Sequence, residues 1–209
     1  ALRLAQIMNS AGLPGGMITI VTGHTEEIGP LLWRHPAVEL VSFTGSTAVG
    51  KRIAREAAYR RLVLELGGND PLIILSDADP EEAVRLAVTG AFKNSGQRCT
   101  AVKRLEQSIA EDFAARLAEA TASLLTGDPR DPQTDIGTVI CEDAAIEIEH
   151  RIFEAVANGA HLLTGGQRKG ALVTPAVLDH VTPCMELVAK ETFGPCAPIL
   201  RVENLEAAI

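Results

Sequence analysis

The chain has 209 residues, of which 46% are hydrophobic and 22% charged, and its formal net charge is −8. These values are typical of a globular protein with one large domain or two small ones. The negative charge argues against nucleic acid or an anionic membrane surface as a partner. No apolar run approaches the roughly 20 residues that span a bilayer. We therefore expect neither of these partners.

Helical and strand patterns alternate through the first third of the chain. The periodicity and the Gly and Pro stops predict, in chain order, a helix over 2–11, a strand over 17–21, a helix near 26–34, a strand over 40–43, a helix from 46 or 47 to about 59 and a strand over 62–66. The pair Gly67-Gly68 then interrupts the pattern. It is the best candidate for a domain boundary.

The alternation resumes after that glycine pair. We expect a strand over 72–75, a helix over 80–92, a short β-like stretch over 101–105, a helix from Ile109 to about Leu125, a polar loop over 127–137, a helix over 142–157 and strands over 162–163 and 172–178. The spacing of Ser108 and Glu111 is that of a capping box. Alternation of this kind predicts an α/β fold with mostly parallel strand pairing.

Both ends of the chain look incomplete. The sequence opens within the amphipathic pattern of its first helix, and residues 204–209 resemble the first turn of a helix that continues. We therefore expect the chain to be a piece of a longer protein.

The segment from Val41 to Lys51 predicts an anion site. A buried strand that turns at Gly45 and Ser46 into a helix would direct backbone N–H groups and the helix dipole toward a bound anion. The same segment has part of the phosphate-loop pattern G-x-x-x-x-G-K-[ST], but Arg52 stands where that pattern needs a hydroxyl. A plain strand–turn–helix corner is an equal alternative.

Glu65 lies between two leucines near the end of a predicted strand. A carboxylate is costly to bury in such a position, so it should be paired or used. In a cleft, desolvation would suit it to act as a general base. The alternative is a solvated strand end.

Cys99 stands in the polar loop Asn94–Thr100, beside Arg98. Its neighbours are not apolar enough for a core position, and the adjacent cation favours a reactive thiolate. For Cys141, Cys184 and Cys196 we expect inert core positions. No C-x-x-C pair is present, so we expect no metal site, and free thiols favour a reducing cytosol.

A fourth candidate segment is Lys190–Pro195. Glu191, Phe193 and the following Gly-Pro turn could together hold a sugar and a flat ring, or could form a structural turn.

Taken together, these segments resemble the aldehyde dehydrogenase superfamily across nearly the whole chain. The similarity rests on four motifs in the family's order: Phe43–Thr47, Leu64–Gly68, Gly96–Cys99 and Glu191–Pro195. The 34 residues from Glu65 to Cys99 (99 − 65 = 34) also match the family's interval between base and nucleophile.

The resemblance implies a dinucleotide cofactor, NAD with NADP not excluded. Gly45 and Ser46 would lie under its pyrophosphate, and Gly50 would let the helix approach. Glu191 would hold the nicotinamide ribose and Phe193 would back the ring. Residues 1–68 would then be part of a Rossmann-like, parallel-sheet cofactor domain, and residues 69–209 part of an α/β catalytic domain.

The resemblance also implies the chemistry. Cys99 would attack the aldehyde to give a thiohemiacetal and then a thioester, and Glu65 would activate the hydrolytic water. A relative that transfers the acyl group to CoA usually lacks this carboxylate, so Glu65 favours hydrolysis. A phosphate-loop nucleotide-binding protein and an inert fragment are the alternatives from other classes.

The anticipated substrate is a small aldehyde. Arg98, next to the nucleophile, resembles the arginine of members that oxidise phosphorylated or phosphonylated aldehydes, since a guanidinium fork matches such anions. Phosphonoacetaldehyde is the first expectation, and glyceraldehyde-3-phosphate and lactaldehyde are the alternatives. The family further implies a homodimer or homotetramer at full length.

The chain departs from the family's pattern in two ways. The stretch between Arg104 and Ser108 looks shortened by a residue or more. A lysine segment that grips the adenosine ribose and an asparagine of the oxyanion hole would lie upstream of residue 1. We therefore expect these 209 residues to be inactive by themselves.

Overall fold

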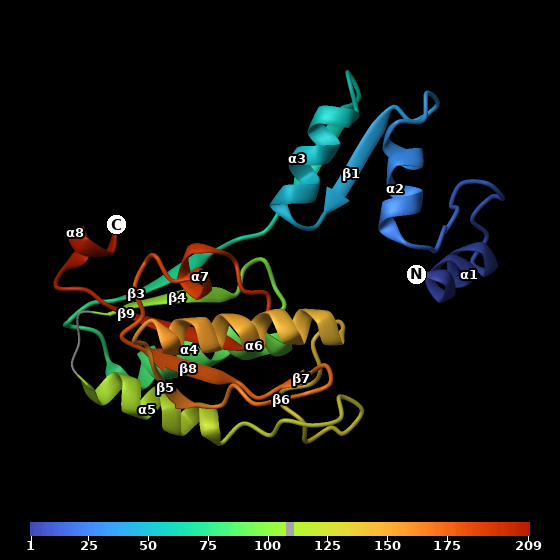
Figure 1. The fold of residues 1–209 in the computed structure, drawn as a ribbon. Coiled ribbons are helices and arrows are strands. Elements are labelled where there is room, and N and C mark those ends of the chain that lie inside the picture. The colour runs from blue at the N-terminus through green and yellow to red at the C-terminus, as the bar shows by residue number, and fades with distance from the viewer. Residues whose placement is uncertain (108–110) are drawn as a thin grey trace. The chain divides into compact units, whose positions relative to one another are not determined.

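The computed structural model describes residues 1–107 and 111–209, and it divides the chain into two compact units, residues 1–66 and residues 67–209 (Figure 1). The assignment of a cofactor domain to residues 1–68 and a catalytic domain to residues 69–209 stays a prediction. The expected α/β fold with mainly parallel strands is confirmed. The predicted capping box at Ser108 and the helix start at Ile109 lie outside the described residues.

The first unit is a small α/β layer. Its elements are α1 (Leu2–Ser10), α2 (Thr25–Trp33), β1 (Leu40–Thr44), α3 (Thr47–Glu56) and β2 (Arg61–Glu65). Strands β1 and β2 pair in parallel, and a core of Trp33, Ile53 and Ala57 lies under them. Helix α3 ends before its predicted limit, because Ala58 adopts a left-handed φ of 54°.

The predicted strand over 17–21 is wrong. Those residues are irregular, and within the described chain no segment pairs with them. A strand is defined by its ladder of hydrogen bonds, so an apolar run without a neighbouring strand does not form one.

The second unit is built on a five-stranded sheet of order β3-β4-β9-β8-β5. These strands are β3 (Asp70–Ile74), β4 (Val102–Gln107), β5 (His161–Thr164), β8 (Ala176–Asp179) and β9 (Cys196–Arg201). Only the β5–β8 pair of this sheet is antiparallel.

The other elements of this unit are helices and a hairpin. They are α4 (Pro80–Phe92), the 3₁₀ turn η1 (Lys93–Gly96), α5 (Glu111–Ala122), α6 (Glu142–Ala157), the hairpin of β6 (Arg168–Lys169) and β7 (Leu172–Val173), α7 (Glu186–Ala189) and α8 (Leu205–Ala208). Two apolar clusters fill the unit, one containing α6 residues and the other containing residues of α4 and α5.

Two sequence expectations for this unit need correction. The predicted strand over 172–178 is two strands, because the chain leaves β7 at Thr174 and Pro175 before β8 begins. Strand β9 and helix α7 were not anticipated. The centre of β9 is Pro198, a residue that normally argues against a central strand because it lacks the N–H donor.

Candidate functional site

The loop that carries Cys99 is held in an unusual backbone conformation. After α4 the chain passes through Asn94, Ser95 and Gly96 with φ angles of 57°, 54° and 69°. Left-handed residues other than glycine are strained, and such strain persists only where the surroundings enforce it. Gly96 has a further constraint, since a Cβ there would lie 2.1 Å from the carbonyl oxygen of Gly194.

Several side-chain hydrogen bonds fasten this loop from different directions. Ser95 Oγ donates to the carbonyl of Gly137 at 3.0 Å, and Gln97 Oε1 accepts from the N–H of Ile140 at 2.8 Å. Lys103 Nζ donates to the carbonyl of Gly96 at 2.6 Å. The residues before the cysteine are therefore fixed, while Cys99 itself is exposed.

The cysteines differ in exposure from what the sequence suggests. The core position expected for Cys196 is confirmed, since it is buried and burial raises the pKa of its thiol to about 12. The same expectation is wrong for Cys141 and Cys184, which are exposed. Cys141 is the N-cap of α6, and Cys184 lies in the turn before α7, so both stand at element ends on the surface.

Arg98 is half-buried and turns toward α4. Its Nη2 donates to the carbonyls of Gly90 at 2.8 Å and Thr89 at 3.3 Å, near the C-terminal end of that helix. Its Nε is buried without an acceptor among the described residues. Arg98 thus joins α4 to the cysteine loop and keeps one unused donor.

The segment Glu191–Gly194 lies against the same loop. Glu191 Oε1 accepts from the N–H of Gly68 at 3.2 Å. Arg151 on α6 donates to the carbonyl of Glu191 at 2.6 Å and to Thr192 Oγ1 at 3.0 Å. Phe193 is 46% exposed, so its ring is available to a ligand.

Gly68 lies in contact with both the Cys99 loop and the Glu191–Gly194 segment. A Cβ at Gly68 would lie 2.3 Å from the carbonyl oxygen of Cys99, so no side chain fits there. Within the second unit, the structure therefore brings together Cys99, Arg98, Glu191 and Phe193. Lys103 and Arg151 are not among the residues that the sequence predicts for the site, and the only local signal for Lys103 is a lysine within a predicted strand.

The remaining candidates lie together at one edge of the small sheet in the first unit. Thr44 and Glu65 are register partners at the carboxyl ends of β1 and β2, and the N–H of Gly45 donates to the carbonyl of Glu65 at 3.1 Å. Ligands of open parallel sheets bind at this edge. The Glu65 side chain is exposed there.

Helix α3 begins at that same edge. Ser46 is its N-cap, with Oγ accepting from the N–H of Val49 at 3.3 Å. The helix packs closely on the strand that follows it, because a Cβ at Gly50 would lie 2.4 Å from the Leu66 side chain. The unpaired N–H groups of the first helical turn remain available to an anion.

Arg52 gives the phosphate-loop alternative no support. Its Nη1 binds Glu26 at 2.9 Å and its Nε binds Glu56 at 3.1 Å, while its guanidinium lies 5.6 Å from the centre of the Trp33 ring. It supplies no hydroxyl for magnesium. Among residues 1–107 and 111–209, no cluster of three or more His, Cys, Asp or Glu side chains could hold a metal ion.

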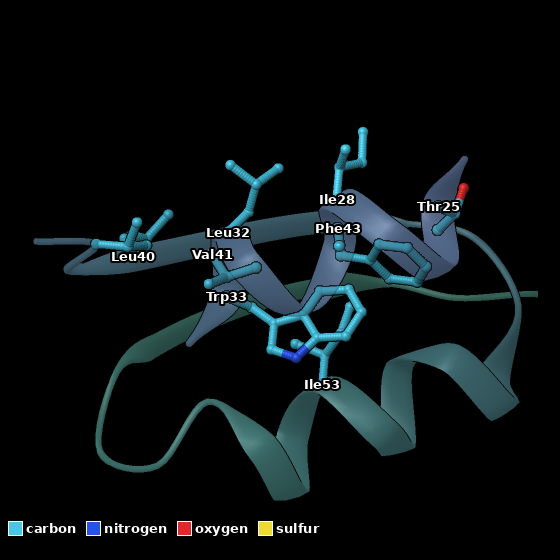
Figure 2. A pocket seen from close by; sticks show the side chains of 10 residues that line it. Thr25, Ile28, Leu32, Trp33, Leu40, Val41, Phe43 and Ile53 are labelled. Carbon is cyan, nitrogen blue, oxygen red and sulfur yellow. The ribbon is translucent and has the colours of Figure 1, made fainter. Parts of the chain in front are cut away.

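An apolar pocket of about 400 Å³ lies between α2, β1 and α3 (Figure 2). Trp33, Phe43, Val41 and Ile53 are among the side chains that point into it. None of the ten residues that line it is charged, and Gly45, Ser46 and Glu65 are not among them. The pocket is an uncovered part of this unit's apolar interior, distinct from the candidate residues.

The class of protein follows from these two arrangements. The first unit is a parallel α/β layer in which a helix begins at the carboxyl ends of the strands, and the second unit presents an exposed cysteine on a strained loop. Such features occur in enzymes that bind a cofactor and form a covalent intermediate. The aldehyde dehydrogenase family model matches residues 1–209, and the chain belongs to that family.

Individual relatives cover the whole chain. A sulfoacetaldehyde dehydrogenase of Neptuniibacter caesariensis is 38% identical over 100% of this chain and 46% of its own length. The crystal structure of the NADP-dependent glyceraldehyde-3-phosphate dehydrogenase of Bacillus halodurans C-125 with NADP has 42% identity and a TM-score of 0.95, over 99% of this chain and 44% of that one.

A betaine aldehyde dehydrogenase of Staphylococcus aureus, solved with NAD⁺, has 33% identity and a TM-score of 0.93, over 99% of this chain and 43% of that one. The chain thus spans less than half the length of each of these relatives.

Proposed function

We propose that the protein containing this chain oxidises a small aldehyde to its carboxylic acid with NAD⁺ or NADP⁺. The observation that carries the proposal is the exposed Cys99, presented by a loop whose preceding residues are fixed in a strained conformation. Strain of this kind gathers at sites where a reacting group must be pre-organised. Membership of the family supplies the reaction class.

In this proposal Cys99 attacks the carbonyl carbon of the aldehyde, and the new C–S bond gives a thiohemiacetal. Bound NAD(P)⁺ would supply the acceptor for the hydride that leaves this carbon. Loss of the hydroxyl proton to solvent then leaves the Cys99 thioester. Glu65 removes a proton from water, and the resulting hydroxide attacks the Cys99 thioester. The tetrahedral adduct expels the Cys99 thiolate and the acid leaves. Glu65 then releases its proton to solvent, which returns the enzyme to its starting state.

The residues present fit a dinucleotide. Ser46 caps α3, and the first N–H groups of that helix would face a pyrophosphate without competition from an acidic residue in the first turn. Gly45 and Ser46 would hold the pyrophosphate, Glu191 the nicotinamide ribose and Phe193 the ring. The similar structures with NADP and with NAD⁺ leave both cofactors within the proposal.

The substrate that Arg98 suits best is an anionic aldehyde. Arg98 directly precedes Cys99 in the chain, and a guanidinium binds a phosphonate, phosphate or sulfonate through charge-assisted hydrogen bonds. Phosphonoacetaldehyde is the first candidate, and glyceraldehyde-3-phosphate and lactaldehyde are the alternatives. The sulfoacetaldehyde dehydrogenase among the relatives supports an anionic group of this kind.

We further propose a cytoplasmic homodimer or homotetramer. The four free cysteines, three of them exposed, suit a reducing compartment. Among the described residues, no helix is long and apolar enough to cross a bilayer.

The test is an aldehyde panel with both cofactors on the full-length protein, comparing wild type with Cys99→Ser and Glu65→Gln. Cys99→Ser should lower kcat by more than roughly 1000-fold, since removing a nucleophile can cost on the order of a millionfold. Glu65→Gln should give a burst of reduced cofactor followed by slow turnover, because only deacylation is blocked. Cys184→Ser is the matched control. A Cys99→Ser enzyme with wild-type turnover contradicts the mechanism.

The substrate class has its own variant. Arg98→Leu should lower kcat/KM for phosphonoacetaldehyde by about 10- to 150-fold, the equivalent of one charge-assisted hydrogen bond, and barely affect propanal. Because Arg98 also binds two carbonyls of α4, an equal fall for both aldehydes would assign it to the loop's structure instead.

A further inference from the structure

Lys103 is a buried cation in the second unit. It lies on β4, is 3% exposed, and belongs to none of the four motifs that carry the family resemblance. Its Nζ donates to the carbonyl of Gly96 at 2.6 Å and to the carbonyl of Thr192 at 3.0 Å. An ammonium group is expensive to desolvate, so a buried lysine needs partners that repay this cost.

The surroundings of Lys103 are only partly anionic. Burial lowers its pKa, the charge of Glu191 raises it, and the charge of nearby Arg98 lowers it further. No carboxylate among the described residues forms an ion pair with Nζ, and its partners are two carbonyl oxygens. Keeping an ammonium group buried there costs stability that an apolar side chain would not cost.

Those two carbonyls belong to distant parts of the chain. Gly96 lies 7 residues before Lys103, in the strained loop that leads to Cys99. Thr192 lies 89 residues after Lys103, next to Phe193. One ammonium group therefore ties the nucleophile's loop to the segment proposed to face the cofactor.

Phe193 is the third contact. Nζ lies 5.1 Å from the centre of its ring, within cation–π distance. Because the ring is partly exposed, burial alone does not fix its orientation. The Lys103 ammonium group is a contact that would favour one orientation of the ring.

We infer that Lys103 is a positioning residue that holds the Cys99 loop and the Thr192–Phe193 segment in one relative geometry. This rests on the proposed function, in which the cysteine-bound carbon and the nicotinamide must meet. A misplacement of about 1 Å between reacting groups can cost on the order of 100-fold in rate. If Lys103 served only the stability of the fold, its replacement would lower the yield of folded protein but would leave the rate per active site unchanged.

The experiment compares wild type, Lys103→Met and Lys103→Arg in the full-length protein, with Lys169→Met as the control. Lys169 is an exposed lysine of the β6–β7 hairpin. For each variant, active sites are titrated, the rate of cofactor reduction in a single turnover is expressed per active site, and the cofactor KM is measured. Lys103→Met should slow that step by roughly 10- to 100-fold and raise the cofactor KM.

Lys103→Arg retains a cation and donors, so it should recover most of both parameters, and Lys169→Met should match wild type. A Lys103→Met enzyme with fewer active sites, but with the wild-type rate per active site and the wild-type cofactor KM, would overturn the inference. If Lys103→Met does not fold, Lys103→Gln, which keeps N–H donors without the charge, replaces it under the same criteria.

A second measurement needs neither cofactor nor turnover. Hydrogen exchange of the free protein should speed up in both 94–100 and 190–195 in Lys103→Met, with β9 unchanged. Unchanged exchange in either segment contradicts the inference. If wild type oxidises no aldehyde, the proposed function fails, yet this exchange result still decides whether Lys103 couples the two segments.

Discussion

The two compact units differ in how deeply their strands are buried. In residues 1–66, β1 and β2 alternate between exposed and half-buried positions, and no residue in either strand is fully buried. In residues 67–209, every residue of β8 and every residue of β9 except Arg201 is buried. Runs of three aliphatic residues occur in both units, as in β2 (Leu62–Leu64) and β8 (Ala176–Leu178). An apolar pattern therefore predicts that a strand favours burial, but the strand is buried only where other elements pack against it.

The uncovered side chains of the first unit make the same point. Leu31 is 71% exposed, Met17 69% and Val63 46%. The second unit instead buries polar groups, including Glu106, Lys103 and Asp179, each less than 5% exposed. The first unit thus leaves large apolar side chains exposed to solvent, and the second encloses polar side chains in its interior. The following predictions test each side of that contrast.

The largest expected effect is on Cys196, a probe of the second unit's interior. With a thiol pKa of about 12, it should react with iodoacetamide at least roughly 1000-fold more slowly than Cys99 near neutral pH, because the thiolate is the nucleophile. Alkylation followed by peptide mapping measures this. In denaturant all four cysteines should react alike, and fast labelling of Cys196 in the native protein would contradict the burial.

Hydrogen exchange should separate the units next. Amides of β9 should exchange at least about 100-fold more slowly than those of β1, because local opening costs least where few neighbours are lost. Mass spectrometry of the 209-residue chain measures both peptides in one sample. Equal protection would mean that the first unit's small core is as resistant to opening as the five-stranded sheet.

Glu106 offers a smaller, local test. It lies within β4 at 3% exposure, with Oε2 unpaired and Arg104 only at 3.7 Å. Replacing Glu106 by Leu should stabilise the protein by about 1–3 kcal/mol, since an unsatisfied buried polar group is removed. Chemical denaturation measures the change, with the exposed Glu119→Leu as control. A destabilised Glu106→Leu would show that the ion pair contributes more than it costs.

The smallest effect concerns pH. Burial acts to raise the pKa of Asp179, but hydrogen bonds from Arg201 and from the His180 N–H outweigh it, and the pKa lies below the usual 3.8. A carboxyl group with a depressed pKa stabilises the fold above its unfolded pKa and loses that contribution as pH falls through its folded pKa.

The difference in stability between wild type and Asp179→Asn should therefore be constant from pH 5 to 7 and become smaller below about pH 4. Thermal melts across this range measure it. If the difference in stability did not change with pH, the packing of the Asp179 side chain, and not its charge, would account for the lower stability of the variant.

Local sequence rules succeeded where one segment contains its own signals. The predicted helices over 80–92 and 142–157 are α4 and α6 with the same limits. Asp79 caps the first of them through two N–H groups, as helix-start preferences require. The rules failed for β9, because a proline in its centre conceals a strand that the pairing with β8 imposes.

The sequence by itself determined the α/β class and the family, and it predicts Cys99, Glu65 and the other candidate residues, because all of these rest on contiguous motifs. Only the tertiary structure decided that Arg98 bonds to α4, that Cys141 and Cys184 are exposed, and that Lys103 joins two segments. These are contacts between residues far apart along the chain. No local pattern specifies them, because they form only when strands and loops from the whole unit pack together.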